Sequence, residues 1–305
     1  MTVGPAGRLL LLFLALPVLM SAAVRDPLPG SDRINGSSRV PPTIRAIGLD
    51  KAGVTLVTAA SADFETQVRK ETGKWADAAL HSSPQLALVK NESPQTIVAY
   101  AVSFKSIRPD GKWDFHHIEF KYPDAVVTTD PEFGPLLRDR EIRPSEQRLV
   151  SRDFEIDPAL DNSWLSQMID MQQKDLGEFT RGEDIATLEI AIDAVLFEDG
   201  RLLGPNRSQV DTRFLLLLQR KQELYRNVID LMASGRSLGD ALLKLQPALP
   251  TTTQAMEEML DDHLARSAIG DVRRWRARYG DERAADVLRH AVRREPFAIR
   301  KVATE

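Results

Sequence analysis

The sequence predicts an antiparallel β-sandwich followed by an all-α helical domain. Apolar residues alternate with a period of two in short segments between residues 54 and 198, which is typical of half-buried strands. Turn sequences separate these segments, which favours an antiparallel sandwich over a parallel sheet. After Pro205 the apolar period becomes helical. We therefore expect the sandwich over residues 44–205, the helical domain over 206–295 and a tail over 296–305.

The first residues of the chain have the pattern of an export signal. A single cation, Arg8, precedes the uninterrupted apolar run Leu9–Leu16, which is too short to span about 30 Å of hydrocarbon. Ser21 and Ala23 then supply the small residues that signal peptidase requires. The pattern predicts a signal peptide over residues 1–23 and an exported protein, either periplasmic or fully secreted.

The next segment, residues 24–43, is predicted to be a disordered linker. It contains four prolines, two glycines and several serines, and it has no apolar period. Such a composition disfavours both helix and strand. The folded part of the chain is therefore expected to begin near residue 44.

Composition excludes several classes of protein. The chain has no cysteine, so it has no disulfide, no thiol nucleophile and no thiolate metal site. Its 40 basic and 44 acidic residues give a net charge of −4, without the basic excess of a protein adapted to nucleic acid. No segment after the signal peptide has the 18 apolar residues of a membrane span. We expect a soluble exported protein with no nucleic-acid partner, no transmembrane span and no cofactor.

The clearest strand is Thr96–Lys105, where bulky residues alternate with small ones. The turn sequence Pro109–Gly111 follows it and predicts a hairpin with a strand over Phe115–Tyr122. A helical spacing of apolar residues predicts a helical insertion near 162–178. The remaining strands are expected over Val54–Thr58, Gln85–Lys90, Arg148–Ile156 and Thr187–Glu198.

A long helix is expected to begin at a capping box formed by Ser208 and Asp211 and to end at Ala233. Its segment Phe214–Leu218 is apolar on all sides, which predicts burial against the sandwich. One further helix is expected to begin at Ser237 and to end before Pro247, and another to begin near Thr251–Thr253 and to end at Gly270. Two more are expected to begin at Asp271 and at Asp281.

The segment Gly235–Gly239 matches Gly-x-Ser-x-Gly, the nucleophile elbow of α/β-hydrolases. Ser237 would be the nucleophile, and His263 or His290 would be its base. The elbow needs a strand before the serine, whereas the preceding residues read as a long helix. The other interpretation makes Ser237 a helix cap with Asp240 three residues later.

The neighbours His116 and His117 point to opposite faces of a strand, so together they do not bind one ion. His117 and Glu119 share a face about 6.6 Å apart and would supply two metal ligands if other strands supplied more. The alternative is an exposed polar face, and we predict no metal site.

The C-terminal region is divided in charge. From Val272 to Lys301 there are ten cations against four acids, whereas the preceding segment, Ala255–Asp271, has five acids and one cation. Arg273, Arg274 and Arg278 are candidates for binding an anionic partner such as a cell-surface polymer or a phospholipid surface. The other interpretation is that the acidic and basic helices pair with each other.

Two segments carry a resemblance to a group of proteins. Asp193–Pro205, with Phe197-Glu198-Asp199-Gly200, and Lys90–Ser93, followed by Ile97 and Ala99-Tyr100, are similar to uncharacterised secreted proteins of environmental bacteria. The resemblance implies an immunoglobulin-like sandwich and an envelope location, and it supplies no catalytic residues.

The sequence thus indicates an exported, non-catalytic protein that acts in binding or envelope assembly, with an envelope protein or an anionic polymer as its partner. The alternative is an exported hydrolase with a site at the junction of sandwich and helices.

Overall fold

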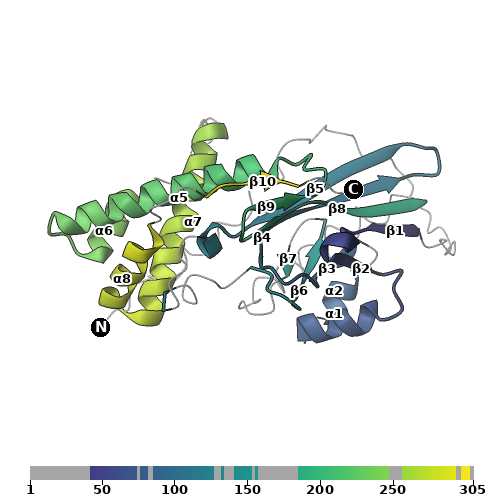
Figure 1. The fold of residues 1–305 in the computed structure, drawn as a ribbon, viewed down its shortest axis with the longest axis horizontal. Helices are drawn as coiled ribbons and strands as arrows, with labels where there is room; N and C mark the ends of the chain where they lie inside the picture. Colours follow the sequence, from purple (N-terminus) through teal and green to yellow (C-terminus); the bar gives the residue numbers. More distant parts are fainter. Residues whose placement is uncertain are drawn as a thin grey trace, which may run out of the picture. The chain divides into compact units, whose positions relative to one another are not determined.

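The computed structural model describes residues 42–73, 76–81, 85–126, 132–133, 141–152, 155–156, 185–246, 256–292 and 297–302 (Figure 1). The predicted signal peptide lies outside these residues, and so does the predicted linker except for its last two positions. The predicted helical insertion near 162–178 also lies outside them.

The described strands form two β-sheets. Sheet A has the order β10-β9-β8-β4-β5. In addition, β1 pairs with the first half of β8, whereas β9 pairs with its last residues. Sheet B has the order β2-β3-β6-β7. The strands of sheet A are β1 (Thr43–Ile47), β4 (Ile97–Ile107), β5 (Trp113–Lys121), β8 (Thr187–Phe197), β9 (Arg201–Leu203) and β10 (Arg300–Lys301). Those of sheet B are β2 (Val54–Thr58), β3 (Leu86–Asn91), β6 (Gln147–Ser151) and β7 (Glu155–Ile156).

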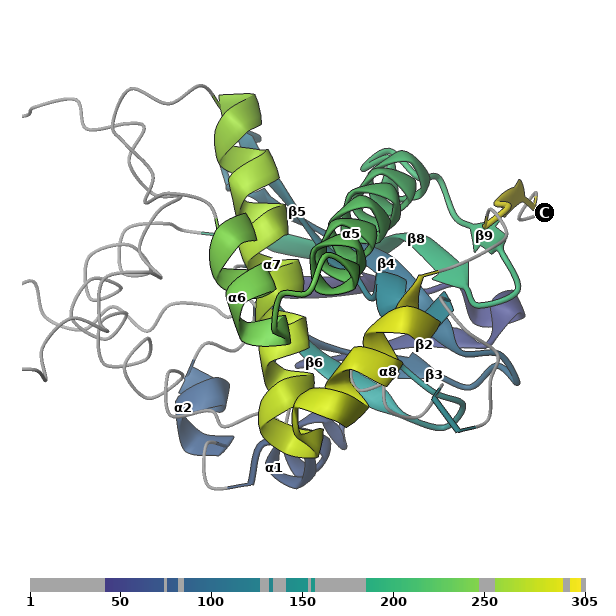
Figure 2. The same ribbon diagram turned by 90° about the vertical axis from the view of Figure 1, so that its left-hand side faces the viewer.

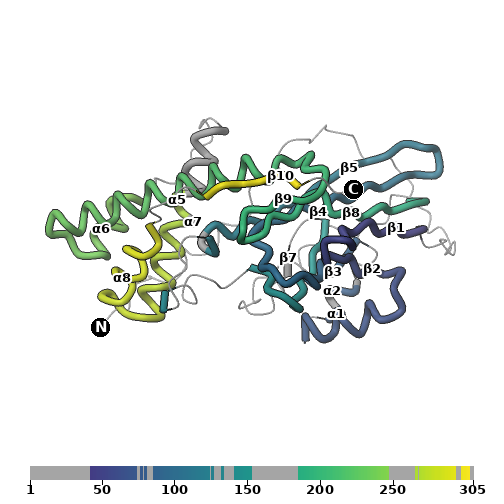
Figure 3. Tube along the Cα trace, viewed as in Figure 1, coloured from purple at the N-terminus to yellow at the C-terminus, as the bar shows by residue number. Residues whose placement is uncertain are grey.

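The predicted hairpin is confirmed, because β4 and β5 pair antiparallel around the turn after Ile107. The expectation of a wholly antiparallel sandwich is wrong, because β1 runs parallel to β8 and β10 runs parallel to β9. Figure 3 shows β10 beside β9, although the two are far apart in the sequence. Gly200 permits this return, since a Cβ atom there would collide with the carbonyl oxygen of Ala298. Sheet A is therefore mixed.

The two sheets share a core. Their facing side chains include Val89 of β3, Val150 of β6, Tyr100 of β4 and Ile190 of β8, all fully buried. Burying this apolar surface is the main term that holds the sheets together. The predicted strand Arg148–Ile156 is in fact two short strands, β6 and β7, which pair antiparallel with each other.

Helices pack on the outer faces of both sheets (Figures 1 and 2). Phe64 and Val68 of α1 (Phe64–Thr72) pack on the outer face of sheet B, and α2 (Ala76–His81) contributes to the same apolar cluster. The outer face of sheet A carries small residues, Ala99 and Ala101, which let α5 approach closely. The larger helices are α5 (Val210–Ala233), α6 (Leu238–Leu245), α7 (Met256–Tyr279) and α8 (Asp281–Ala291).

The helices after residue 206 share one core with sheet A, as expected. The predicted burial of the whole segment Phe214–Leu218 is wrong, because only Phe214 and Leu218 are buried, whereas Leu215 is 38% and Leu216 is 43% exposed. Phe214 and Tyr225 of α5 lie in that core beside alanines of β4. Two short 3-10 turns, Asp50–Ala52 and Pro123–Val126, connect strands. No helix in the described ranges is both long and apolar enough to cross a bilayer.

The predicted helix end at Gly270 and the predicted cap at Asp271 are wrong, because α7 continues through both positions. Glycine inside a helix costs about 1 kcal/mol, and the burial of Ile269 and Val272 on either side offsets this cost. Asp271 forms ion pairs rather than a cap. Asp281 is the first residue of α8 rather than its cap, and it pairs with Arg276.

Candidate functional site

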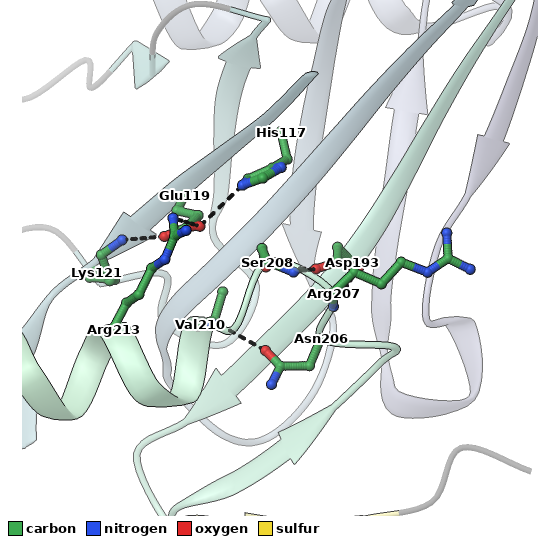
Figure 4. A network of polar contacts seen from close by, with 9 residues as sticks. All are labelled: His117, Glu119, Lys121, Asp193, Asn206, Arg207, Ser208, Val210 and Arg213. Carbon is green, nitrogen blue, oxygen red and sulfur yellow. Dashed lines mark hydrogen bonds and ion pairs between the residues drawn. The ribbon is translucent and has the colours of Figure 1, made fainter. Parts of the chain in front are cut away.

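A β-bulge places a carboxylate where sheet A meets α5. Ala101 of β4 pairs with Ala194, and Val102 pairs with Ile192, so Asp193 is an extra residue of β8. A bulge redirects the side chain of the extra residue. Asp193 is 6% exposed, and its side chain turns toward the loop that precedes α5 (Figure 4).

The Asp193 carboxylate binds this loop through three hydrogen bonds. It accepts from the amide of Arg207 at 3.1 Å, and from the amide and hydroxyl of Ser208 at 2.8 and 2.6 Å. The predicted capping role of Ser208 is wrong, because the N-cap of α5 is Gln209, and the Ser208 hydroxyl donates to Asp193. The side-chain oxygen of Asn206 accepts from the first helical amide, that of Val210, at 2.9 Å.

Asp211 completes the helix start. Burial raises the pKa of its carboxyl, but hydrogen bonds from Asn206 and Lys301 outweigh this effect, so the pKa lies below its ordinary value. Its side chain accepts from Asn206 at 2.7 Å and pairs with Lys301 of β10 at 3.0 Å. The junction therefore joins β8, β10 and α5 through carboxylates that already have partners.

A second carboxylate, Glu119 of β5, lies beside the first turn of α5 and is surrounded by cationic side chains (Figure 4). Lys121 and Arg213 each place a nitrogen 2.5 Å from it, and the His117 ring nitrogen lies 3.3 Å away. The Glu119 side chain is 6% exposed. Because the two cations already occupy its oxygens, this carboxylate is poorly placed to take a proton from a substrate.

The proposed pair of metal ligands, His117 and Glu119, does come together on one face of β5. However, Lys121 and Arg213 occupy the Glu119 oxygens, and a divalent cation would have to displace them. His116, the neighbour of His117, instead contacts Asp114 at 2.8 Å, and this hydrogen bond lowers the pKa of the Asp114 carboxyl. Within the described ranges, no three His, Asp or Glu side chains are placed to hold a metal ion.

Ser237 is the N-cap of α6, and α5 rather than a strand precedes it. Its hydroxyl oxygen accepts from the Asp240 amide at 3.1 Å, and the hydroxyl donates to the Asp240 carboxylate at 2.7 Å. His290 of α8 stacks on Phe133 at 3.7 Å, and its Nδ1 lies 2.9 Å from the Asp286 carbonyl. The geometry matches a helix cap and not a nucleophile elbow.

The third candidate of that set, His263, belongs to α7, but its side chain lies outside the described residues. In the serine version of the hydrolase hypothesis, Ser237 lacks the preceding strand that a nucleophile elbow needs. The other version uses carboxylates from several strands. At the junction these are Asp193 and Glu119, and each is occupied by its own donors.

Replacing Ser237 with alanine tests the cap directly. We expect the substitution to lower the free energy of unfolding by about 1 kcal/mol, because one amide at the start of α6 loses its acceptor. Chemical denaturation of S237A beside S237T, which keeps the hydroxyl, would measure this. If both variants lose the same stability, the hydroxyl is not the capping group.

The candidate anion-binding arginines lie along the second half of α7. Arg273 donates to Gln246 at 2.6 Å, Arg274 pairs with Asp271, and the Arg278 guanidinium lies 5.4 Å from the centre of the Tyr279 ring. Neighbouring arginines of α7 and α8 pair with acids, among them Arg276 with Asp281, Arg283 with Glu132 and Arg289 with Asp286. These contacts favour the interpretation in which acids and bases of this region pair with each other.

A surface that the sequence reasoning missed lies on the first half of β5. Trp113 is 64% exposed and Phe115 is 39% exposed. Both share a face with His117, whose ring centre is 6.2 Å from that of Phe115. We call Trp113, Phe115 and His117 the aromatic stripe. Its signal was the alternation Trp-x-Phe-x-His, which was overlooked because the strand was expected to begin only at Phe115.

No protein-family model, curated protein or solved structure matches this chain.

Proposed function

We propose that this chain is an exported, non-catalytic protein that acts in binding or envelope assembly, with the aromatic stripe as its contact surface. The exposure of Trp113 carries the proposal. Burying an aromatic side chain of this kind against a partner contributes about 1.5–3 kcal/mol, and aromatic residues are enriched among the strongest contacts of binding interfaces.

The state of the polar groups supports a binding role over a catalytic one. Ser237 is engaged by Asp240, and the Asp193 and Glu119 carboxylates are engaged by neighbouring donors. The stripe differs from these groups because it presents large side chains to solvent. The export signal predicted from the sequence belongs to the same proposal, and so does the immunoglobulin-like class that the resemblance implies. The core shared by the two sheets supports that fold class.

The test is capture from an envelope extract by the chain beginning at Val24, which contains the whole compact unit Pro41–Glu305. Replacing Trp113 and Phe115 together with alanine should reduce the captured material about tenfold or more, since truncating anchor residues has effects of this size. Loss of the Trp113 side chain, which is 64% exposed, should change the thermal unfolding temperature little, whereas Phe115 is 39% exposed and its truncation should lower that temperature modestly.

The matched control is L243A, which removes an exposed apolar side chain of α6 that is 66% exposed. Its capture should equal that of the wild type. If the double variant captures as much as L243A does, the stripe is not the contact surface and the proposed function fails.

A further inference from the structure

The aromatic stripe is one edge of a larger exposed sheet face. The register of sheet A places Arg45 of β1 beside Glu189 of β8, Glu189 beside Lys105 of β4, and Lys105 beside Phe115 of β5. Paired residues in neighbouring strands point to the same face. We call these four residues, with Trp113 and His117, the platform.

The dimensions of the platform follow from sheet geometry. The stripe extends about 13 Å along β5, at about 3.3 Å per residue. The row from Arg45 to Phe115 crosses four strands and is about 14 Å wide, at about 4.8 Å per strand. The platform is therefore long and wide enough for several linked rings of a polymer to lie on it.

The platform combines flat rings with both donors and acceptors. The Lys105 ammonium lies 5.6 Å from the centre of the Trp113 ring, close enough for a cation–π contact. The side chains of Arg45 and Glu189 form no ion pair and no hydrogen bond within the part of the chain that the structure describes. The carboxylate of Glu189 thus lies between two cationic side chains with its hydrogen-bonding capacity available.

Resting on the proposed function, we infer that the platform binds a linear, uncharged polysaccharide with β-linked sugar rings. Such a chain is extended and presents apolar C–H faces, which stack on Trp113 and Phe115. Its hydroxyl groups act as donors and as acceptors, so they complement the carboxylate of Glu189 together with Arg45 and Lys105. Mixed charge is suited to a neutral polyol, because each hydroxyl finds a partner of either kind.

The same charges disfavour the other macromolecular partners of a Trp-bearing hairpin. A polyanion or an anionic bilayer would meet the carboxylate of Glu189 in the middle of the platform. At the end of the hairpin, Lys112 pairs with Asp110 at 3.1 Å, so these two groups together add no positive charge. Anionic headgroups favour polybasic segments instead.

The experiment is calorimetric titration of the chain beginning at Val24 with cellohexaose and chitohexaose, beside retention on insoluble cellulose and chitin. We expect at least one hexasaccharide to bind, and its disaccharide to bind more weakly, because the platform is longer than one ring. W113A should weaken binding about tenfold or more, E189A should also weaken it, and L243A should bind as the wild type does.

The inference is overturned if neither hexasaccharide binds, or if the W113A and F115A variants bind as tightly as the wild type. Retention by phosphatidylglycerol vesicles that depends on Trp113, without hexasaccharide binding, overturns it in favour of a membrane partner.

Failure of the inference differs from failure of the proposed function. Two results together would show that the contact surface is right and the polysaccharide is wrong. The first is that the double variant no longer captures material from the envelope extract. The second is that capture by the wild type survives treatment of the extract with glycoside hydrolases but not with protease. If capture does not depend on the stripe, the proposed function itself is wrong.

Discussion

Replacing Asp271 with asparagine should lower the free energy of unfolding by about 3–5 kcal/mol, the loss expected when a buried ion pair is broken from one side. Asp271 is 6% exposed and Lys221 of α5 is 5% exposed, and their charged atoms lie 2.5 Å apart. The substitution removes a carboxylate that compensates the buried ammonium group of Lys221. Arg274, whose side chain is 53% exposed, is stabilised by water when it loses the same carboxylate.

The double variant K221M/D271L separates the charge effect from simple packing. Replacing both ions with apolar side chains removes the buried charges together, and this change is often neutral or stabilising. Urea denaturation of the single and double variants measures the difference. We expect the double variant to be more stable than D271N, and equal losses in the two would mean that the pair contributes through packing alone.

The described strands in the middle of the chain were predictable because their signals are local. The alternation of bulky and small residues located β4, and the Pro-Asp-Gly turn located the hairpin with β5. Ser237 was located for the same reason, because a cap depends only on residues three positions apart.

The missed elements depend on contacts that the sequence does not display. β10 has two residues and exists because the chain returns beside β9. In α1 only Phe64, Val68 and Thr72 are buried, so its apolar pattern is weak. Glycine at position 270 suggested a helix end, but burial on both sides keeps α7 continuous.

The candidate site was the least predictable part, because it is assembled from distant residues. Arg213 and Glu119 are 94 positions apart in the sequence, and nothing local joins them. The sequence predicts Asp193 only as part of the strand Thr187–Glu198, whereas its pairing with β4 makes it the extra residue of a bulge. The alternation of the aromatic stripe is visible in the sequence. Its exposure is not, because it depends on which end of β5 is covered by α5.

The hydrogen bonds of Asp193 predict that this residue holds the start of α5 in place. Replacing it with alanine leaves the amides of Arg207 and Ser208 without their acceptor, so we expect a loss of about 3–5 kcal/mol in the free energy of unfolding.

The control for this variant is S208A, which keeps both amide bonds to Asp193 and removes only the hydroxyl bond of 2.6 Å. Its loss should be about 1 kcal/mol. Gly204 supports the interpretation, because a Cβ atom there would lie 2.5 Å from the Asp193 carbonyl oxygen, so the backbone of the loop is also held against β8. Hydrogen exchange measures the local effect: in D193A the first-turn amides of α5 should exchange faster than those near Tyr225. Uniform exchange along α5 would mean that the bulge contributes to global stability without fixing the helix start.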